Sequence, residues 1–168
     1  MQQLSLPSRT FGAAARTLHR AAPNITAALQ ASLLAGTALL IVMGFIGVVG
    51  YDESPWRLLR AIAAVLRGPD VLDDADEFDL AIVATGLALF YALSTLYGVA
   101  LSFLLGDSPR RYAMAIGVAY GFALYSAVFH GLAARYPWLA AYRTIDTLIA
   151  HVLFGALLAG AYCAFRHD

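Results

Sequence analysis

Four long apolar stretches dominate this chain of 168 residues and restrict what it can fold into. They cover residues 25–51, 78–105, 112–134 and 138–165, and each reaches the ~20 residues that a helix needs to cross a hydrocarbon core of ~30 Å. A backbone in hydrocarbon must satisfy its own hydrogen bonds, which a helix does within one segment. We therefore predict an all-α fold, an integral membrane four-helix bundle made of residues 25–168.

The composition agrees with a protein that is surrounded by lipid. Hydrophobic residues make up 61% of the chain, charged residues only 13%, and the mean hydropathy is +0.70. All 11 basic residues are arginine and the formal net charge is zero, so no basic patch predicts a nucleic-acid partner. The single cysteine, Cys163, rules out an internal disulfide and a thiolate metal site. We expect the lipid bilayer as a partner and no metal or cofactor.

The first 24 residues contain three arginines, Arg9, Arg16 and Arg20, and no acid. Residues 1–24 are predicted to form a cytoplasmic amphipathic segment that its arginines hold at the membrane surface. An organellar transit peptide has a similar composition and is the alternative. A cleaved secretory signal is disfavoured, because the apolar stretch that follows is too long for the core of such a signal.

The arginines that flank the four stretches indicate the orientation of the chain. With both termini in the cytoplasm, six arginines lie on the inner side and five on the outer side. The excess favours cytoplasmic termini.

The first outer loop is predicted to hold a short interfacial helix. Ser54 and Pro55 form a helix-start signal, and apolar residues then alternate with arginines until Gly68. A helix over residues 55–67 is too short to cross a bilayer and should lie in its interface. The residues expected to anchor it and its surroundings at headgroup level are Trp56, Arg57, Arg60, Arg67 and Trp138.

Residues 71–77, which follow this helix, are rich in acids. A solvated loop that balances the nearby arginines accounts for them. The functional alternative is a vestibule that attracts cations, or a strip that binds a basic partner.

Tight connections join the second, third and fourth stretches. Residues 106–111 and the pair Pro137-Trp138 are typical of short turns, so these three spans are predicted to be antiparallel neighbours. Gly117 and Gly121 lie four residues apart in the third span, a spacing that permits close helix packing. We expect this packing inside the bundle, with dimerisation as the alternative.

Five ionisable residues lie within the predicted spans or at their mouths: Asp79, His130, Arg143, Asp146 and His151. Charge is costly in hydrocarbon, so such groups tend to face the bundle interior and to pair. A hairpin between the third and fourth spans sets His130 level with Thr144 or Asp146, and Arg143 lies about one helical turn from Asp146. We therefore predict a polar cluster of His130, Arg143 and Asp146 near the outer surface, with Asp79 at a similar level.

Two roles are open for this cluster. It either neutralises buried charges and locks the hairpin, or it binds or relays a proton or another cation. His151 lies deeper, where we expect a hydrogen bond to a neighbouring helix or a role in proton handling. The difference in depth between the two histidines disfavours a bis-histidine haem. Because the chain shows no nucleophile with a base, no phosphate-binding loop and no metal-ligand cluster, an enzyme is the least favoured class.

A family resemblance is carried by motifs in loops and spans: Ser54-Pro55-Trp56, residues 60–66, Phe78-Asp79, Tyr97-Gly98, Tyr136-Pro137-Trp138, Arg143, Ala150-His151, Phe154-Gly155 and Tyr162. Over residues 30–165 the chain resembles a group of small uncharacterised four-span proteins of proteobacteria, some of which carry the automatic label "sodium:proline symporter". The resemblance implies a multi-pass protein of the bacterial inner membrane and no established activity. Four spans without an internal repeat are too few for the midplane site of a true symporter of that kind. The chain departs from the group at Arg57-Leu58-Leu59, where glycine and prolines are expected.

We expect a structural or accessory membrane protein, either a homo-oligomer or a small subunit of a larger membrane complex. The alternative is a minimal transporter or channel that uses the outer polar cluster for proton or cation handling. A water-accessible cavity that reaches His151 from the outer mouth favours transport, whereas a dry interior favours the accessory role.

Overall fold

The computed structural model describes residues 23–74 and 76–166. Within these residues there is no strand, and four helical segments are long and apolar enough to cross a membrane. The all-α fold with four candidate spans, predicted from the apolar stretches, is therefore confirmed. The amphipathic segment predicted over residues 1–24 lies outside the described residues, apart from its end at residues 23–24.

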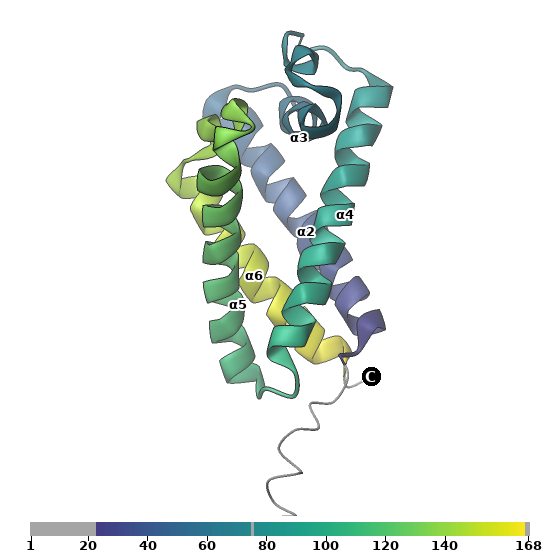
Figure 1. The fold of residues 1–168 in the computed structure, drawn as a ribbon, viewed down its shortest axis with the longest axis vertical. Coiled ribbons are helices and arrows are strands. Elements are labelled where there is room, and N and C mark those ends of the chain that lie inside the picture. Colours follow the sequence, from purple (N-terminus) through teal and green to yellow (C-terminus); the bar gives the residue numbers. More distant parts are fainter. Residues whose placement is uncertain (1–22, 75, 167–168) are drawn as a thin grey trace, which may run out of the picture.

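Two of the four spans change helical type near one end. The first and third spans continue from α-helix into π-helix, whereas the second and fourth are α-helical throughout. In Figure 1 the described ends of the chain lie together at one end of the bundle, opposite the helix labelled α3. The spans are α2 (Ile25–Phe45) with η2 (Ile46–Gly50), α4 (Leu80–Leu105), α5 (Arg110–Tyr125) with η4 (Ser126–Gly131) and η5 (Leu132–Ala134), and α6 (Ile145–Phe165).

Side-chain caps begin three of these helices. Asn24, Asp79 and Thr144 each accept a hydrogen bond from the backbone N–H three residues further on, at 3.0, 3.0 and 3.2 Å. Such a cap satisfies an N–H group that has no partner inside the helix.

The fourth span begins later than predicted. Residues Pro137–Tyr142 form a separate 3-10 helix, η6, and Arg143 then leaves helical geometry with φ −78° and ψ 54°. The predicted span over residues 138–165 was therefore wrong at its start, because Thr144 caps a new helix there.

The helix predicted in the first outer loop forms as α3 (Arg57–Arg67), followed by the 3-10 turn η3 (Pro69–Leu72). Figure 1 shows α3 end-on, so it runs across the spans and covers one end of the bundle. We call this end the outer end, and the opposite one, where the described chain ends lie, the inner end. The helix α3 packs chiefly on α4, where the carbonyl of Leu59 lies so close to Gly86 that a Cβ at Gly86 would overlap it. The helix is therefore part of the bundle as well as of its outer surface.

The spatial order of the spans differs from their order in the chain. α4 packs on α2, α2 on α6, and α6 on α5, so the first and fourth spans form the centre. α4 and α5 are joined by a short turn, yet they touch only sparsely and diverge toward the outer end in Figure 1. The prediction that the second and third spans are antiparallel neighbours therefore holds only on the side of their turn, because a turn fixes only the ends that it joins.

In the inner half of the bundle, α4 and α5 are nevertheless connected by hydrogen bonds. The Tyr120 hydroxyl donates to the Tyr97 carbonyl at 2.9 Å. Arg166, at the end of α6, donates to the carbonyls of Gly106 and Ser108 in the turn between α4 and α5. The two helices are thus joined at the turn and near mid-span and separate beyond it.

α5 and α6 approach each other most closely. A Cβ at Gly117, Gly121 or Gly155 would overlap backbone atoms of the facing helix. Close approach of this kind gives dispersion contacts in hydrocarbon, where no hydrophobic effect draws helices together. The Gly117/Gly121 pair packs within the chain, as expected from its spacing.

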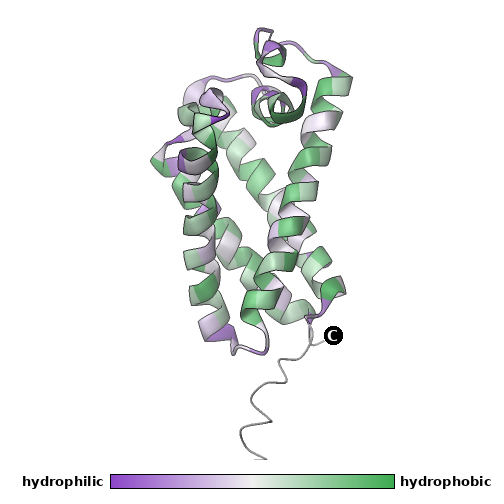
Figure 2. Ribbon diagram, in the orientation of Figure 1, coloured by the Kyte–Doolittle hydropathy of each residue, from purple (hydrophilic) through white to green (hydrophobic). Residues whose placement is uncertain are grey.

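The outer surface of the spans is apolar. Figure 2 shows hydrophobic residues along all four spans and hydrophilic ones gathered at the two ends. Ile41, Phe45 and Leu96 are 65%, 65% and 60% exposed. Such surfaces suit contact with lipid, in agreement with a multi-pass membrane protein.

Candidate functional site

Asp79, the residue predicted at the mouth of the second span, caps α4. Its carboxylate accepts a hydrogen bond from the N–H of Ile82 at 3.0 Å. This bond to the charged form holds the pKa of the Asp79 carboxyl below its ordinary value. The structure therefore gives Asp79 a local partner in its own helix.

Arg143 and His130 lie at the outer end of the third span but do not meet. Arg143 donates from Nε to the carbonyl of Phe129 at 2.6 Å, where the helix has become π-helical. His130 is exposed and meets the ring of Tyr125 edge-on, with ring centroids 5.6 Å apart. Among the described residues, no ion pair within 4.0 Å joins either side chain to Asp146.

Asp146 pairs with the first span instead. Its carboxylate accepts a hydrogen bond from the Tyr51 hydroxyl at 2.8 Å, which ties the outer ends of the first and fourth spans together. The predicted cluster of Asp79, His130, Arg143 and Asp146 is thus not assembled. The numerical pairing of His130 with Asp146 failed because residues 137–144 are not part of the fourth helix.

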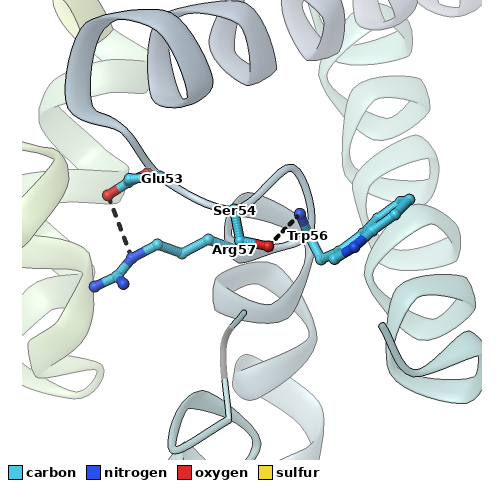
Figure 3. Close-up of polar contacts among 4 residues, drawn as sticks. All are labelled: Glu53, Ser54, Trp56 and Arg57. Atoms are coloured by element: carbon cyan, nitrogen blue, oxygen red, sulfur yellow. Dashed lines mark hydrogen bonds and ion pairs between the residues drawn. The ribbon is translucent and has the colours of Figure 1, made fainter. Parts of the chain in front are cut away.

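Arg57, Arg67 and Trp56, three of the predicted anchors, lie at the outer surface. Arg57 forms an ion pair with Glu53 at 3.2 Å, and Ser54 accepts a hydrogen bond from the N–H of Trp56 at 3.3 Å (Figure 3). Arg67 is exposed and donates to the Thr85 hydroxyl at 3.1 Å. The Trp56 ring packs on Phe78, the residue before the α4 cap, with centroids 4.7 Å apart.

Arg60 has a different role from the one predicted. It is only 4% exposed, and it donates to the carbonyl of Val71 at 2.7 Å and to that of Glu77 at 3.1 Å. The prediction of Arg60 as a headgroup anchor is wrong, because the loop after α3 folds back and supplies these two carbonyls. Trp138 also binds protein, since its indole N–H donates to the Ala61 carbonyl at 3.0 Å.

A groove of about 340 Å³ lies between α4 and α5, where the two helices diverge. We call it the α4/α5 groove. Side chains of α2 and α6 form its floor, and the apolar side chains of α3 form its roof. The helices α4 and α5, which flank it, touch each other only sparsely. Its walls are aliphatic and aromatic, and the aromatic residues are Phe90, Tyr97, Phe129, Tyr136, Tyr142 and Phe154.

His151 lines the α4/α5 groove from α6. Its Nδ1 lies 2.8 Å from the carbonyl of Thr147, and since a carbonyl only accepts, Nδ1 carries the proton. Its ring packs edge-on against Phe129, with centroids 5.2 Å apart. The hydrogen bond expected from His151 to a neighbouring helix is therefore made within its own helix.

A second pocket, of about 200 Å³, lies at the outer surface between the ends of α2, α3 and α6. Its polar lining includes Glu53, Arg57 and Thr144. It shares Tyr142 with the α4/α5 groove, together with apolar residues of α2 and α3. Burial raises the pKa of Tyr142 to about 12, so this phenol between the two spaces stays protonated at neutral pH.

Within residues 23–74 and 76–166, no group of three or more His, Cys, Asp or Glu side chains is placed to hold a metal ion. Comparison with family models, curated proteins and solved structures finds no match to this chain. The functional reading consequently depends on the geometry of the two pockets.

Sequence reasoning singled out His151 but missed the α4/α5 groove. One signal was present: Phe90, Ser94 and Tyr97 recur at helical spacing in α4 and share the face that lines the groove. Such a pattern shows that these residues share one face of the helix, but it does not show whether that face packs on another helix or lines a cavity. The groove exists because α4 diverges from α5, and no local sequence signal predicts this divergence.

Proposed function

We propose that this protein is a non-enzymatic accessory component of the bacterial inner membrane, acting as a homo-oligomer or as a small subunit of a larger membrane complex. The excess of arginines on the inner side supports cytoplasmic termini. The family resemblance points to the same membrane and to no activity.

One observation carries this proposal: the outer polar groups are engaged in contacts that hold the bundle together. Asp79 caps α4, Arg143 binds a carbonyl of the third span, and Asp146 binds Tyr51 of the first. An ion pathway needs facing polar groups that stay available to the ion, usually along a wet cavity. The larger cavity here is apolar. An accessory role needs only a stable bundle with apolar outer faces, which this chain has.

The test is the mass of the full-length protein after cross-linking in intact membranes and extraction in mild detergent. We expect a discrete species with a mass well above the 17.9 kDa of one chain. It should contain the same proteins with and without the cross-linker. The matched control is a variant with a polar substitution on the lipid-facing side, Leu96→Gln, which should lower the yield of the complex only if α4 contributes to the contact. A single chain at every protein concentration would contradict the proposal.

Transport is the second candidate, and one observation favours it. The α4/α5 groove reaches His151 and shares Tyr142 with the polar outer pocket, so the two spaces are neighbours. The test is proton or cation flux into vesicles that contain the purified protein, compared with its Asp146→Asn variant. Flux that equals that of empty vesicles would remove this candidate, and flux that is lost in Asp146→Asn would favour it over the accessory role.

A further inference from the structure

The α4/α5 groove holds a hydrogen-bond acceptor without a protein partner. Nδ1 of His151 donates to Thr147, so in the neutral imidazole Nε2 carries a lone pair. Nε2 makes no hydrogen bond within the described chain. Every fully buried polar side-chain atom of the described residues has a hydrogen-bond partner, so an unpaired atom cannot be fully buried. Nε2 must therefore be accessible, and the space that His151 lines is the α4/α5 groove. A ligand in the groove that carries an O–H group would supply the missing donor.

The walls of the groove favour a ring. Six aromatic residues line it, five from four different helical elements and Tyr136 from the connection before η6, and they offer both faces and edges for ring packing. The volume of about 340 Å³ is at the lower end of the range for small-molecule sites. Because α4 and α5 touch only sparsely, a ligand with its head in the groove can pass a hydrocarbon tail between the two helices into lipid.

We propose that the α4/α5 groove binds the ring of a lipid-soluble hydroxylated aromatic compound, the chemistry of a hydroquinone or phenol on a hydrocarbon tail, and that Nε2 of His151 accepts a hydrogen bond from its hydroxyl group. This proposal does not rest on the accessory role, because the isolated chain provides the whole site.

Other occupants fit less well. A metal cation would find no carboxylate among the residues that line the groove. A transmembrane helix, about 10–12 Å across with its side chains, is too wide to enter and could only lie across the opening. A quinone presents two acceptors and no donor, so it would leave Nε2 unpaired.

The probe for the test is a hydroquinone with a decyl tail, and the control ligand is the same compound with both hydroxyl groups methylated. The two share a ring and a tail, but only the first can donate. Each is titrated calorimetrically into the full-length protein in detergent under reducing conditions, with empty micelles as the blank for partitioning. We expect saturable binding of the hydroquinone, about three- to tenfold tighter than that of its dimethyl ether.

Two variants of His151 separate the acceptor from the fold. In His151→Asn the amide can still donate to Thr147 as Nδ1 does, but nothing replaces Nε2. In His151→Gln the longer side chain can place an amide oxygen near the position of Nε2. We expect His151→Asn to bind both ligands equally and weakly, and His151→Gln to recover part of the preference for the hydroquinone.

Three results would overturn the proposal. The first is the absence of saturable binding beyond partitioning into micelles. The second is equal binding of hydroquinone and ether by the wild-type protein. The third is a preference that persists in His151→Asn when its unfolding temperature equals that of wild type. If the protein forms an oligomer but does not bind the hydroquinone, only the binding proposal fails. If it binds the hydroquinone but stays a single chain, only the accessory role fails.

Discussion

The helix α5 meets its two neighbours in the chain in opposite ways. Toward α6 it presents Gly117 and Gly121, and the two backbones touch without intervening side chains. Toward α4 the same span presents Leu124 of α5, Val128 of η4 and Leu132 of η5, and a groove separates the two spans. Both pairs are consecutive in the chain, so connectivity does not set their distance. In lipid, the distance between two helices is set by small residues that allow their backbones to touch.

The closed α5/α6 face should be the more sensitive to added volume. In Gly121→Ala the new methyl group would overlap the carbonyl of His151, so the two helices must separate. We expect the free energy of unfolding in detergent to fall by roughly 2–3 kcal/mol. The measurement is thermal or denaturant unfolding followed by circular dichroism. The matched control is Gly44→Ala, where a Cβ has open space and the change should stay within about 1 kcal/mol. Equal effects at both positions would show that the close approach does not matter.

The roof of the open face depends on Arg60. In Arg60→Met the aliphatic volume is kept, but the carbonyls of Val71 and Glu77 lose their donor. We expect a loss of about 2 kcal/mol in unfolding free energy and faster proteolysis within residues 70–77. Arg67→Met is the control, since Arg67 is exposed and has one hydroxyl partner. If cleavage of the loop is as slow in Arg60→Met as in Arg67→Met, the buried guanidinium does not hold the roof.

The open α4/α5 face should tolerate a larger side chain at the groove. Leu93 lines the groove, so the ring in Leu93→Trp can fill it without displacing a helix. We expect a change in unfolding free energy below about 1 kcal/mol, together with loss of hydroquinone binding. Leu96→Trp, on the lipid-facing side of the same helix, should leave both properties unchanged. Marked destabilisation by Leu93→Trp would mean that the groove is closed in the membrane.

The smallest expected effect concerns the Asp79 cap at the start of α4. The pKa of Asp79 is lowered in the fold, so its stabilising effect is present above the ordinary pKa of about 3.9 and is lost as the pH falls through the lowered value. We expect the difference in unfolding temperature between wild type and Asp79→Ala to shrink in acid. In Asp79→Asn the cap remains without a titrating group, so its difference from Asp79→Ala should not depend on pH. A pH-dependent difference there would assign the acid sensitivity to another group.

Part of the candidate site was within reach of sequence reasoning. His151 was identified as a deep polar group, and it lies in the larger cavity. The cluster of His130, Arg143 and Asp146 was wrong because its register assumed a continuous helix from Trp138, whereas Thr144 starts a new one. Arg60 was misplaced because its partners are backbone carbonyls of a loop, and backbone carbonyls carry no residue-specific signal.

The amino-acid sequence by itself determined that the chain forms four helices long and apolar enough to cross a membrane, together with a short amphipathic helix between the first two. Both are consequences of local composition, since a long apolar segment in hydrocarbon has no other way to satisfy its backbone. The tertiary structure alone decided which spans are neighbours, where α4 and α5 part, and which partner each polar group finds. Hydrocarbon makes every apolar helix face nearly equivalent, so these choices depend on contacts between residues far apart in the chain.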